Sequence, residues 1–298
     1  MKNHSKFLFY PILLFCGFLL FVEKTVPAIL LLNISTAFFT AKFSFKHTLF
    51  GILCILAFSA YCFGMEPSLF TGLFILPAFI LGLNLNLRTS FSALLITSTI
   101  AEVSALTLYT RHISSVLNMK PVDLLFGSTL DMVGQSFSTE GMLPPELGSD
   151  VTFFVRQISN ILQTMLPAFY ILFSIFCVYL LFSLVRFLLE KTGHTLDLPR
   201  FHELSFPRSI STIFILIYLI SMFANSPILS NVASVMFALH VVCGLSLVDF
   251  FFVEKKIPKA ARRIILAIII IISSFLGGLT TTLLCCFGMN NSIRSFRK

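Results

Sequence analysis

Nine apolar runs, most of them about as long as a bilayer is thick, constrain this chain more than any other feature. A helix rises about 1.5 Å per residue, so about 20 apolar residues cross a hydrocarbon core of roughly 30 Å. Only 11% of the residues are charged, against about 25% in soluble domains. We therefore predict an all-α, polytopic integral membrane helical bundle with eight or nine transmembrane helices, from runs near 7–22, 26–40, 48–63, 69–86, 90–110, 158–185, 209–224, 228–252 and 264–287.

The positive charges indicate topology. The net charge of +8 is spread over short clusters between the runs, which argues against a nucleic-acid partner. With a cytoplasmic N-terminus and nine crossings, 14 of the 21 basic residues fall inside. The C-terminal SIRSFRK would then lie outside; if the last run turns back within the membrane, eight spans place both ends in the cytoplasm. No signal-peptidase-like site follows Val22, so we expect the first run to be retained.

Glu102 is the one charged residue in the run SFSALLITSTIAEVSALTLY. An ionised acid near the centre of a spanning helix costs roughly 2.5 to 3.5 kcal/mol, so its carboxyl should face protein or water. It can be protonated, paired with a cation, or exposed to a wet cavity. Ser98 shares its helix face.

A polar stripe on the next span is the expected counterpart of Glu102. Arg156, Asn160 and Gln163 are spaced i, i+4 and i+7, which places them on one helix face. Together with Glu102 and Ser98 they predict a polar ligand-binding pocket that opens outward. The alternatives are that Arg156 marks the membrane interface and that the acid is a structural group.

The polar segment 111–157 is the longest extracytoplasmic part in this topology. Residues 122–137 carry apolar residues at Leu125, Leu130 and Val133, which fits a helix on the outer surface or a lid, and equally a tether.

Other polar and small residues are interpreted as packing, hydrogen-bonding or ion-pairing groups. Ala37 and Ala41 permit close helix approach and are candidate partner contacts. Asn86 lies near a span end, where caps and interhelical hydrogen bonds are common. His240 is interpreted as a packed helix residue, and Asp249 as an interfacial ion pair with the Glu-Lys-Lys group that follows it.

Catalytic and cofactor signatures are missing from the sequence. It contains no Gly-rich phosphate loop, no metalloprotease or hydrolase motif, and no C-x-x-C pair. The seven cysteines match neither a disulfide framework nor a zinc site. We predict no enzyme activity, no catalytic residues, no metal site and no cofactor.

The second half of the chain resembles a family of bacterial membrane proteins. Phe-Pro-Arg at 206–208, FALHVVCGLSLVDFFFVEKKIPKAARRIILAIIII at 237–271 and the terminal GMNNSIRSFRK resemble the YybS-like family of uncharacterised bacterial membrane proteins. Ser295 stands where that family has an acidic residue. The first half is similar in layout to the substrate-binding subunits of energy-coupling-factor transporters, which implies a bundle with an outward pocket. The resemblance implies a multi-pass protein of the bacterial inner membrane.

These observations predict one transmembrane domain over 1–298, with a helical bundle at 1–186 and a three-helix region at 187–298. One functional hypothesis is the binding or translocation of a small polar solute. The other is a membrane scaffold that docks cytoplasmic protein partners through the basic loops at 186–208 and 253–263. The lipid bilayer is a partner under both hypotheses.

Overall fold

The computed structural model describes residues 26–43, 45–139, 148–194, 196, 198–224, 226–275 and 278–294. Within these ranges all regular structure is helical, which confirms the all-α class. The elements are α3 (Val26–Lys42), α4 (Phe45–Phe63), α5 (Met65–Asn86), α6 (Phe91–Leu117), α7 (Pro121–Thr139), α8 (Gly148–Lys191), the 3₁₀ turn η2 (Phe201–Glu203), α9 (Arg208–Phe223), α10 (Pro227–Glu254), α11 (Lys259–Phe275) and α12 (Gly278–Arg294).

Five stretches are long and apolar enough to cross a membrane. They are Phe45–Phe63, Met65–Asn86, Phe91–Leu117, Phe153–Lys191 and Pro227–Glu254, and two shorter apolar helices are Ile29–Lys42 and Arg208–Phe223. The predicted run 7–22 lies outside the described residues. The described residues therefore contain five candidate spans, while the count of eight or nine stays a prediction.

The predicted run 264–287 is divided between two helices. α11 ends at Phe275 and α12 begins at Gly278, so the apolar stretch is not one continuous helix. The polar segment at 122–137 is helical, as predicted, and forms most of α7, in which Val122 and Leu130 are buried. Leu125 is exposed, and nothing is described of the Val133 side chain.

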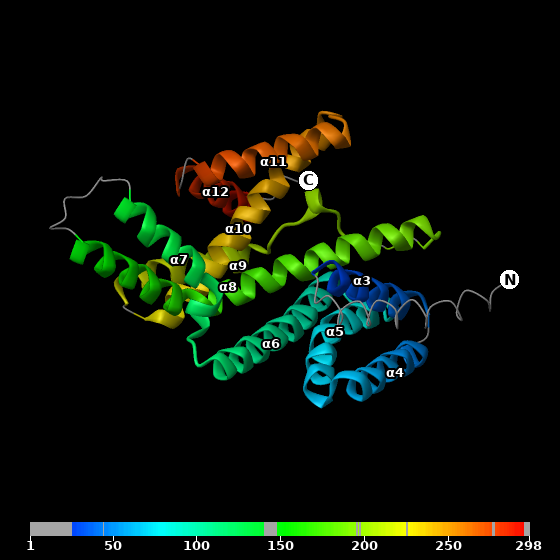
Figure 1. Cartoon of the computed structure of the whole chain (residues 1–298). Coiled ribbons are helices and arrows are strands. Elements are labelled where there is room, and N and C mark those ends of the chain that lie inside the picture. The colour runs from blue at the N-terminus through cyan, green and yellow to red at the C-terminus, as the bar shows by residue number, and fades with distance from the viewer. Residues whose placement is uncertain are drawn as a thin grey trace. The chain divides into compact units, whose positions relative to one another are not determined.

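The chain forms two compact units. Unit 1 comprises Met1–Val155 and Phe173–Leu198, and unit 2 comprises Arg156–Leu172 and Pro199–Lys298. The long helix α8 thus contributes to both units, and the segment Arg156–Leu172 belongs with the C-terminal helices (Figure 1).

The core of unit 1 lies among α3, α5, α6 and the second part of α8. Apolar side chains from all four helices are buried together, with Phe182 the largest of those below 2% exposure. α3 and α5 approach closely at Gly82, where a Cβ would lie 2.5 Å from the Ala37 carbonyl oxygen. The amide of Asn86 donates to the carbonyls of Thr40, Ala41 and Phe43 at 2.9 to 3.2 Å, which confirms the predicted interhelical bonding at this span end.

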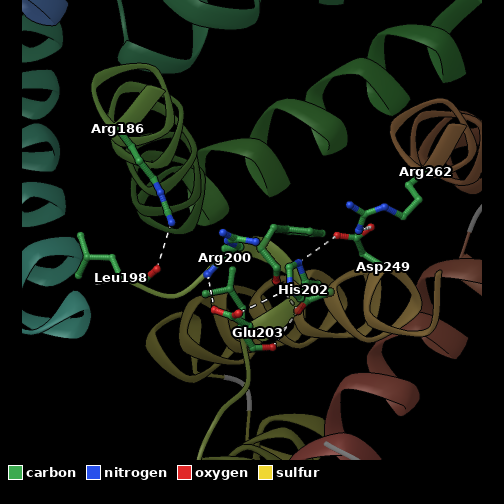
Figure 2. Close-up of polar contacts among 10 residues, drawn as sticks. Arg186, Leu198, Arg200, His202, Glu203, Asp249 and Arg262 are labelled. Atoms are coloured by element: carbon green, nitrogen blue, oxygen red, sulfur yellow. Dashed lines mark hydrogen bonds and ion pairs between the residues drawn. The ribbon is translucent and has the colours of Figure 1, made fainter. Parts of the chain in front are cut away.

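The loop at the end of unit 1 is hydrogen-bonded to α8. The Arg186 guanidinium donates to the Leu198 carbonyl at 3.1 Å and pairs with Glu190 at 2.8 Å (Figure 2). Leu196 and Leu198 pack against the core of the unit, so the chain is held down before it enters unit 2.

Unit 2 is organised around α10. α9 and α12 both pack on α10, and His240 is fully buried between its neighbours. Its Nδ1 hydrogen donates to the Met236 carbonyl at 2.7 Å, so its Nε2 accepts from the Ser211 hydroxyl at 2.9 Å, and Phe214 stacks on its ring. His240 is therefore a packed helix residue, as its sequence context predicts.

Two glycines bring α10 and α12 into close contact. A Cβ at Gly244 would overlap the backbone of Leu284, and a Cβ at Gly288 would overlap the backbone of His240. Because His240 precedes Gly244 whereas Gly288 follows Leu284, the two helices run antiparallel. Glycine at a helix interface allows this separation because no side chain stands between the backbones.

Candidate functional site

Glu102 lies on α6 in unit 1, where it is partly buried. None of the described residues forms a hydrogen bond or an ion pair with its carboxylate. The thiol of Cys177, on the part of α8 that belongs to unit 1, lies within range of its charge. The carboxyl therefore faces into unit 1 without a described cation beside it.

Ser98 stands one turn before Glu102 and is fully buried. Its hydroxyl has no hydrogen-bond partner, unlike the hydroxyls of Thr97 and Ser104 on the same helix, which donate to backbone carbonyls at 2.8 Å. A buried hydroxyl without a partner costs free energy, typically about 1–3 kcal/mol. Ser174 on α8 is also fully buried with its hydroxyl unpaired. Buried hydroxyls without a partner thus occur on α6 and on α8 in unit 1, and also at Thr36 on α3 and Thr48 on α4.

A cluster of aromatic and charged side chains lies farther along α6 in the same unit. The rings of Phe70 and Phe74 on α5 pack edge-on against Tyr109. Beyond them the Nε2 of His112 lies 2.5 Å from a carboxylate oxygen of Glu66, at the start of α5. This pairing was not predicted, because 46 positions separate the two residues.

The predicted stripe lies in unit 2. Arg156, Asn160 and Gln163 all occupy α8 and are all exposed, and their spacing along one continuous helix gives the common face that was predicted. Ser98 and Glu102 belong to the other unit. Ser98 and Glu102 thus lie on α6 and the other three residues on α8, and the ligand-binding pocket stays a prediction.

The hydrogen-bond ladder of α8 changes one turn after Gln163, at Pro167. Pro167 has no N–H, so the Gln163 carbonyl receives no helical hydrogen bond. At the next position the Asn231 amide is inserted into the helix: Ala168 N–H donates to its Oδ1 at 2.9 Å, and its Nδ2 donates to the Thr164 carbonyl at 2.8 Å. In a regular helix those two backbone groups would bond to each other. The Gln163 carbonyl, beside the polar stripe, therefore lacks its regular helical donor.

Ala37 and Ala41, the predicted partner contacts, lie in unit 1. Ala37 is fully buried against α5, and Ala41 packs on the edge of the same core. The close approach that Ala37 permits is thus made within this chain. A contact of these alanines with a partner stays a prediction.

A charged cluster at the C-terminal end of α10 was not predicted in this form. Asp249, only 8% exposed, pairs with Arg262 of α11 at 2.9 Å and lies 3.9 Å from the His202 ring on η2 (Figure 2). The sequence-based interpretation paired Asp249 with the next few residues, and this is wrong. The loop after α10 turns back and brings Arg262 to it instead.

Hydrogen bonds fix the η2 segment onto the same end of α10. The Ser246 hydroxyl donates to the carbonyls of Phe201 and Leu204 at 2.6 and 2.9 Å. The Glu203 carboxylate accepts from the Arg200 N–H at 2.7 Å and lies 3.6 Å from His202 (Figure 2). This segment is therefore held in a defined conformation on unit 2.

Comparison with known proteins places the chain in a family. No curated protein and no solved structure matched it. The profile of the family described as "Predicted membrane protein (DUF2232)" matches residues 9–288, nearly the whole chain. The match agrees with the apolar helices described above. The chain therefore belongs to the DUF2232 family of predicted membrane proteins.

Proposed function

We propose that this protein binds a small polar solute within the membrane, to hold or to translocate it, and that Glu102 is the central group of the site. The observation that carries the proposal is the carboxylate of Glu102, which has no ion pair or hydrogen bond among the described residues. Retaining such a group in a spanning helix costs roughly 2.5–3.5 kcal/mol, which a bound cation or donor would offset.

One further group in the same unit supports the proposal. The hydroxyl of Ser98, one turn from the carboxylate, is fully buried and has no hydrogen-bond partner. Arg156, Asn160 and Gln163 belong to the proposal through their sequence pattern alone. The proposed role is binding or movement of a solute, without a catalytic step.

The number of spans, their orientation and the identity of the membrane are part of the same proposal. Eight or nine spans, a cytoplasmic N-terminus and a bacterial inner membrane follow from the apolar runs, the bias of basic residues and the YybS-like resemblance. In this arrangement 111–157 and α7 lie outside, on the side to which the site would open. The layout of an energy-coupling-factor substrate-binding subunit would provide such an opening.

Mass spectrometry of the purified protein tests the proposal. We expect a small molecule to copurify with the wild-type chain and to be lost from Glu102→Gln and Arg156→Ala. Glu66→Gln is the matched control, because it removes an acid that is 66% exposed and pairs with His112. Retention of the molecule by Glu102→Gln, or equal loss from the control, would contradict the proposal.

A scaffold role is the second candidate, and the η2 segment favours it. Phe201 and Leu204 are bonded to Ser246, which presents the charged side chains of Arg200 and Glu203 in a fixed arrangement. Charge reversal at both positions should abolish function under the scaffold hypothesis and leave it intact under the solute hypothesis.

A further inference from the structure

The ends of α11 are both near the C-terminal end of α10. Arg262, in the first turn of α11, pairs with Asp249 in the last turns of α10. At the other end, α12 begins six residues before Leu284, which lies at the level of Gly244. Six residues of antiparallel helix are about 9 Å, so α12 starts about level with Phe250.

The length of α11 then determines its direction. Its 17 residues extend about 25 Å. If α11 ran alongside α10, it would end far from this level, whereas three peptide units from Phe275 to Gly278 reach at most about 11 Å. α11 therefore runs across the axis of α10, as Figure 1 shows for the orange helix.

One long face of α11 is apolar and uncovered. Ile264, Ile268 and Ile271 are 61%, 47% and 55% exposed, and their spacing places them on one side of the helix. Ser273, by contrast, is 7% exposed and belongs to the side that faces the protein. A face of three isoleucines in contact with water would be unfavourable by about 25 cal/mol for each Å² of apolar surface.

Positive charge is concentrated at the start of the same helix. Lys255, Lys256, Lys259 and Arg263 are all exposed, and no described residue forms an ion pair with any of them. Arg262 is neutralised by Asp249. Ile270 and Ile272 are also exposed, at 51% and 43%, so the apolar surface of α11 is broad. Broad apolar surface next to a cluster of Lys and Arg is attracted to the interface of anionic membranes.

We propose that α11 is an in-plane helix, whose isoleucine face enters the acyl-chain boundary where α10 ends and whose basic turn binds the phosphates of anionic lipids. The antiparallel docking of α12 holds α11 at this depth. The occupant is the lipid surface because the exposed face is apolar along its length and the adjacent cations have no acidic partner among the described residues. This proposal is independent of the solute site.

Tryptophan fluorescence tests the in-plane position, because the chain contains no tryptophan. Ile264→Trp, Ile268→Trp and Ile271→Trp are reconstituted separately in bilayers with lipids brominated at different depths. All three should be quenched best by the same shallow bromine. Leu216→Trp, at an exposed position in the middle of α9, is the control and should be quenched best by deep bromines. A change in depth of about 10 Å from Ile264 to Ile271 would show that α11 crosses the membrane and would overturn the proposal.

Native mass spectrometry tests the lipid recognition. We compare binding of phosphatidylglycerol with that of phosphatidylcholine to the full chain and to a variant in which the four exposed basic residues are changed to glutamine. The preference for phosphatidylglycerol should fall at least about tenfold. The control removes the same charge elsewhere, at exposed positions in other connections or at helix ends: Lys46, Arg88, Lys120 and Lys191. An unchanged preference, or an equal fall in the control, would refute lipid recognition and leave the basic turn available to a protein partner.

Discussion

Replacing Gly288 by alanine is predicted to weaken the packing of α12 on α10. The new Cβ would overlap the carbonyl oxygen of His240 and would lie 2.9 Å from its carbonyl carbon. Ordinary van der Waals contacts are about 3.4–4.0 Å long, so the helices must separate by roughly 1–1.5 Å. Both neighbours are backbone atoms, and no side-chain rotation can relieve the overlap.

The loss of stability can be estimated from the atom contacts that become weaker when α10 and α12 move apart. If on the order of 50 atom pairs at about 0.15 kcal/mol each lose about half of their attraction, the cost is about 4 kcal/mol. Alanine returns about 1 kcal/mol through its higher helix propensity. We expect a net loss of about 3 kcal/mol in the free energy of unfolding, at the upper end of the usual range for overpacking.

Unfolding in mixed micelles, followed by circular dichroism across an SDS titration, measures this difference. Gly278→Ala is the matched control, because it lies on the same helix and no atom comes within 4 Å of its Cβ position. The control should be as stable as the wild type or more stable. If Gly288→Ala behaves like Gly278→Ala, the close crossing and the antiparallel register deduced from it are wrong.

Three other substitutions probe the described contacts. Asn231→Leu should lower the free energy of unfolding by about 1–3 kcal/mol in the same titration, because the buried N–H of Ala168 loses its acceptor. Asp249→Asn should cost about 1–3 kcal/mol, between the values for exposed and buried pairs, and the loss should shrink when Arg262 is changed to glutamine as well. Glu102→Leu should raise the free energy of unfolding by up to about 3 kcal/mol while abolishing solute binding, because it removes a carboxyl that no described residue pairs with.

Each of these predictions has a contradicting result. Unchanged stability of Asn231→Leu would mean that α8 closes its own hydrogen bond after Pro167. Additive losses from the Asp249 and Arg262 variants would show that the two side chains do not interact. A marked destabilisation by Glu102→Leu would indicate a structural partner for the acid and would remove the main support for the binding proposal.

The class of the protein and its helices follow from the sequence because hydropathy depends on residue type and local length alone. The division of the last run does not, since the residues from Ile264 to Phe287 are apolar enough for one helix. The division of this run depends on the contact of Gly288 with α10. The contact includes Gly244, which is 44 positions away in the sequence. Hydropathy has no term for such long-range contacts.

The candidate site shows the same limit. The positions of Glu102 and Ser98 on one helix, and of Arg156 with Asn160 on another, follow from helical periodicity. The insertion of Asn231 into α8 could not be predicted, because a single asparagine in an apolar run carries no indication of its partner. Pro167 was the available signal, because a proline inside a helix leaves the carbonyl four residues before it without its helical donor.

The glycine contact between α10 and α12 has a consequence for biosynthesis. α12 carries adjacent asparagines near its end and is not among the candidate spans found in the described residues. α10, which is a candidate span, leaves the ribosome earlier. We therefore expect α12 to take up its position only after α10 is in place, through the recognition of one helix by the other.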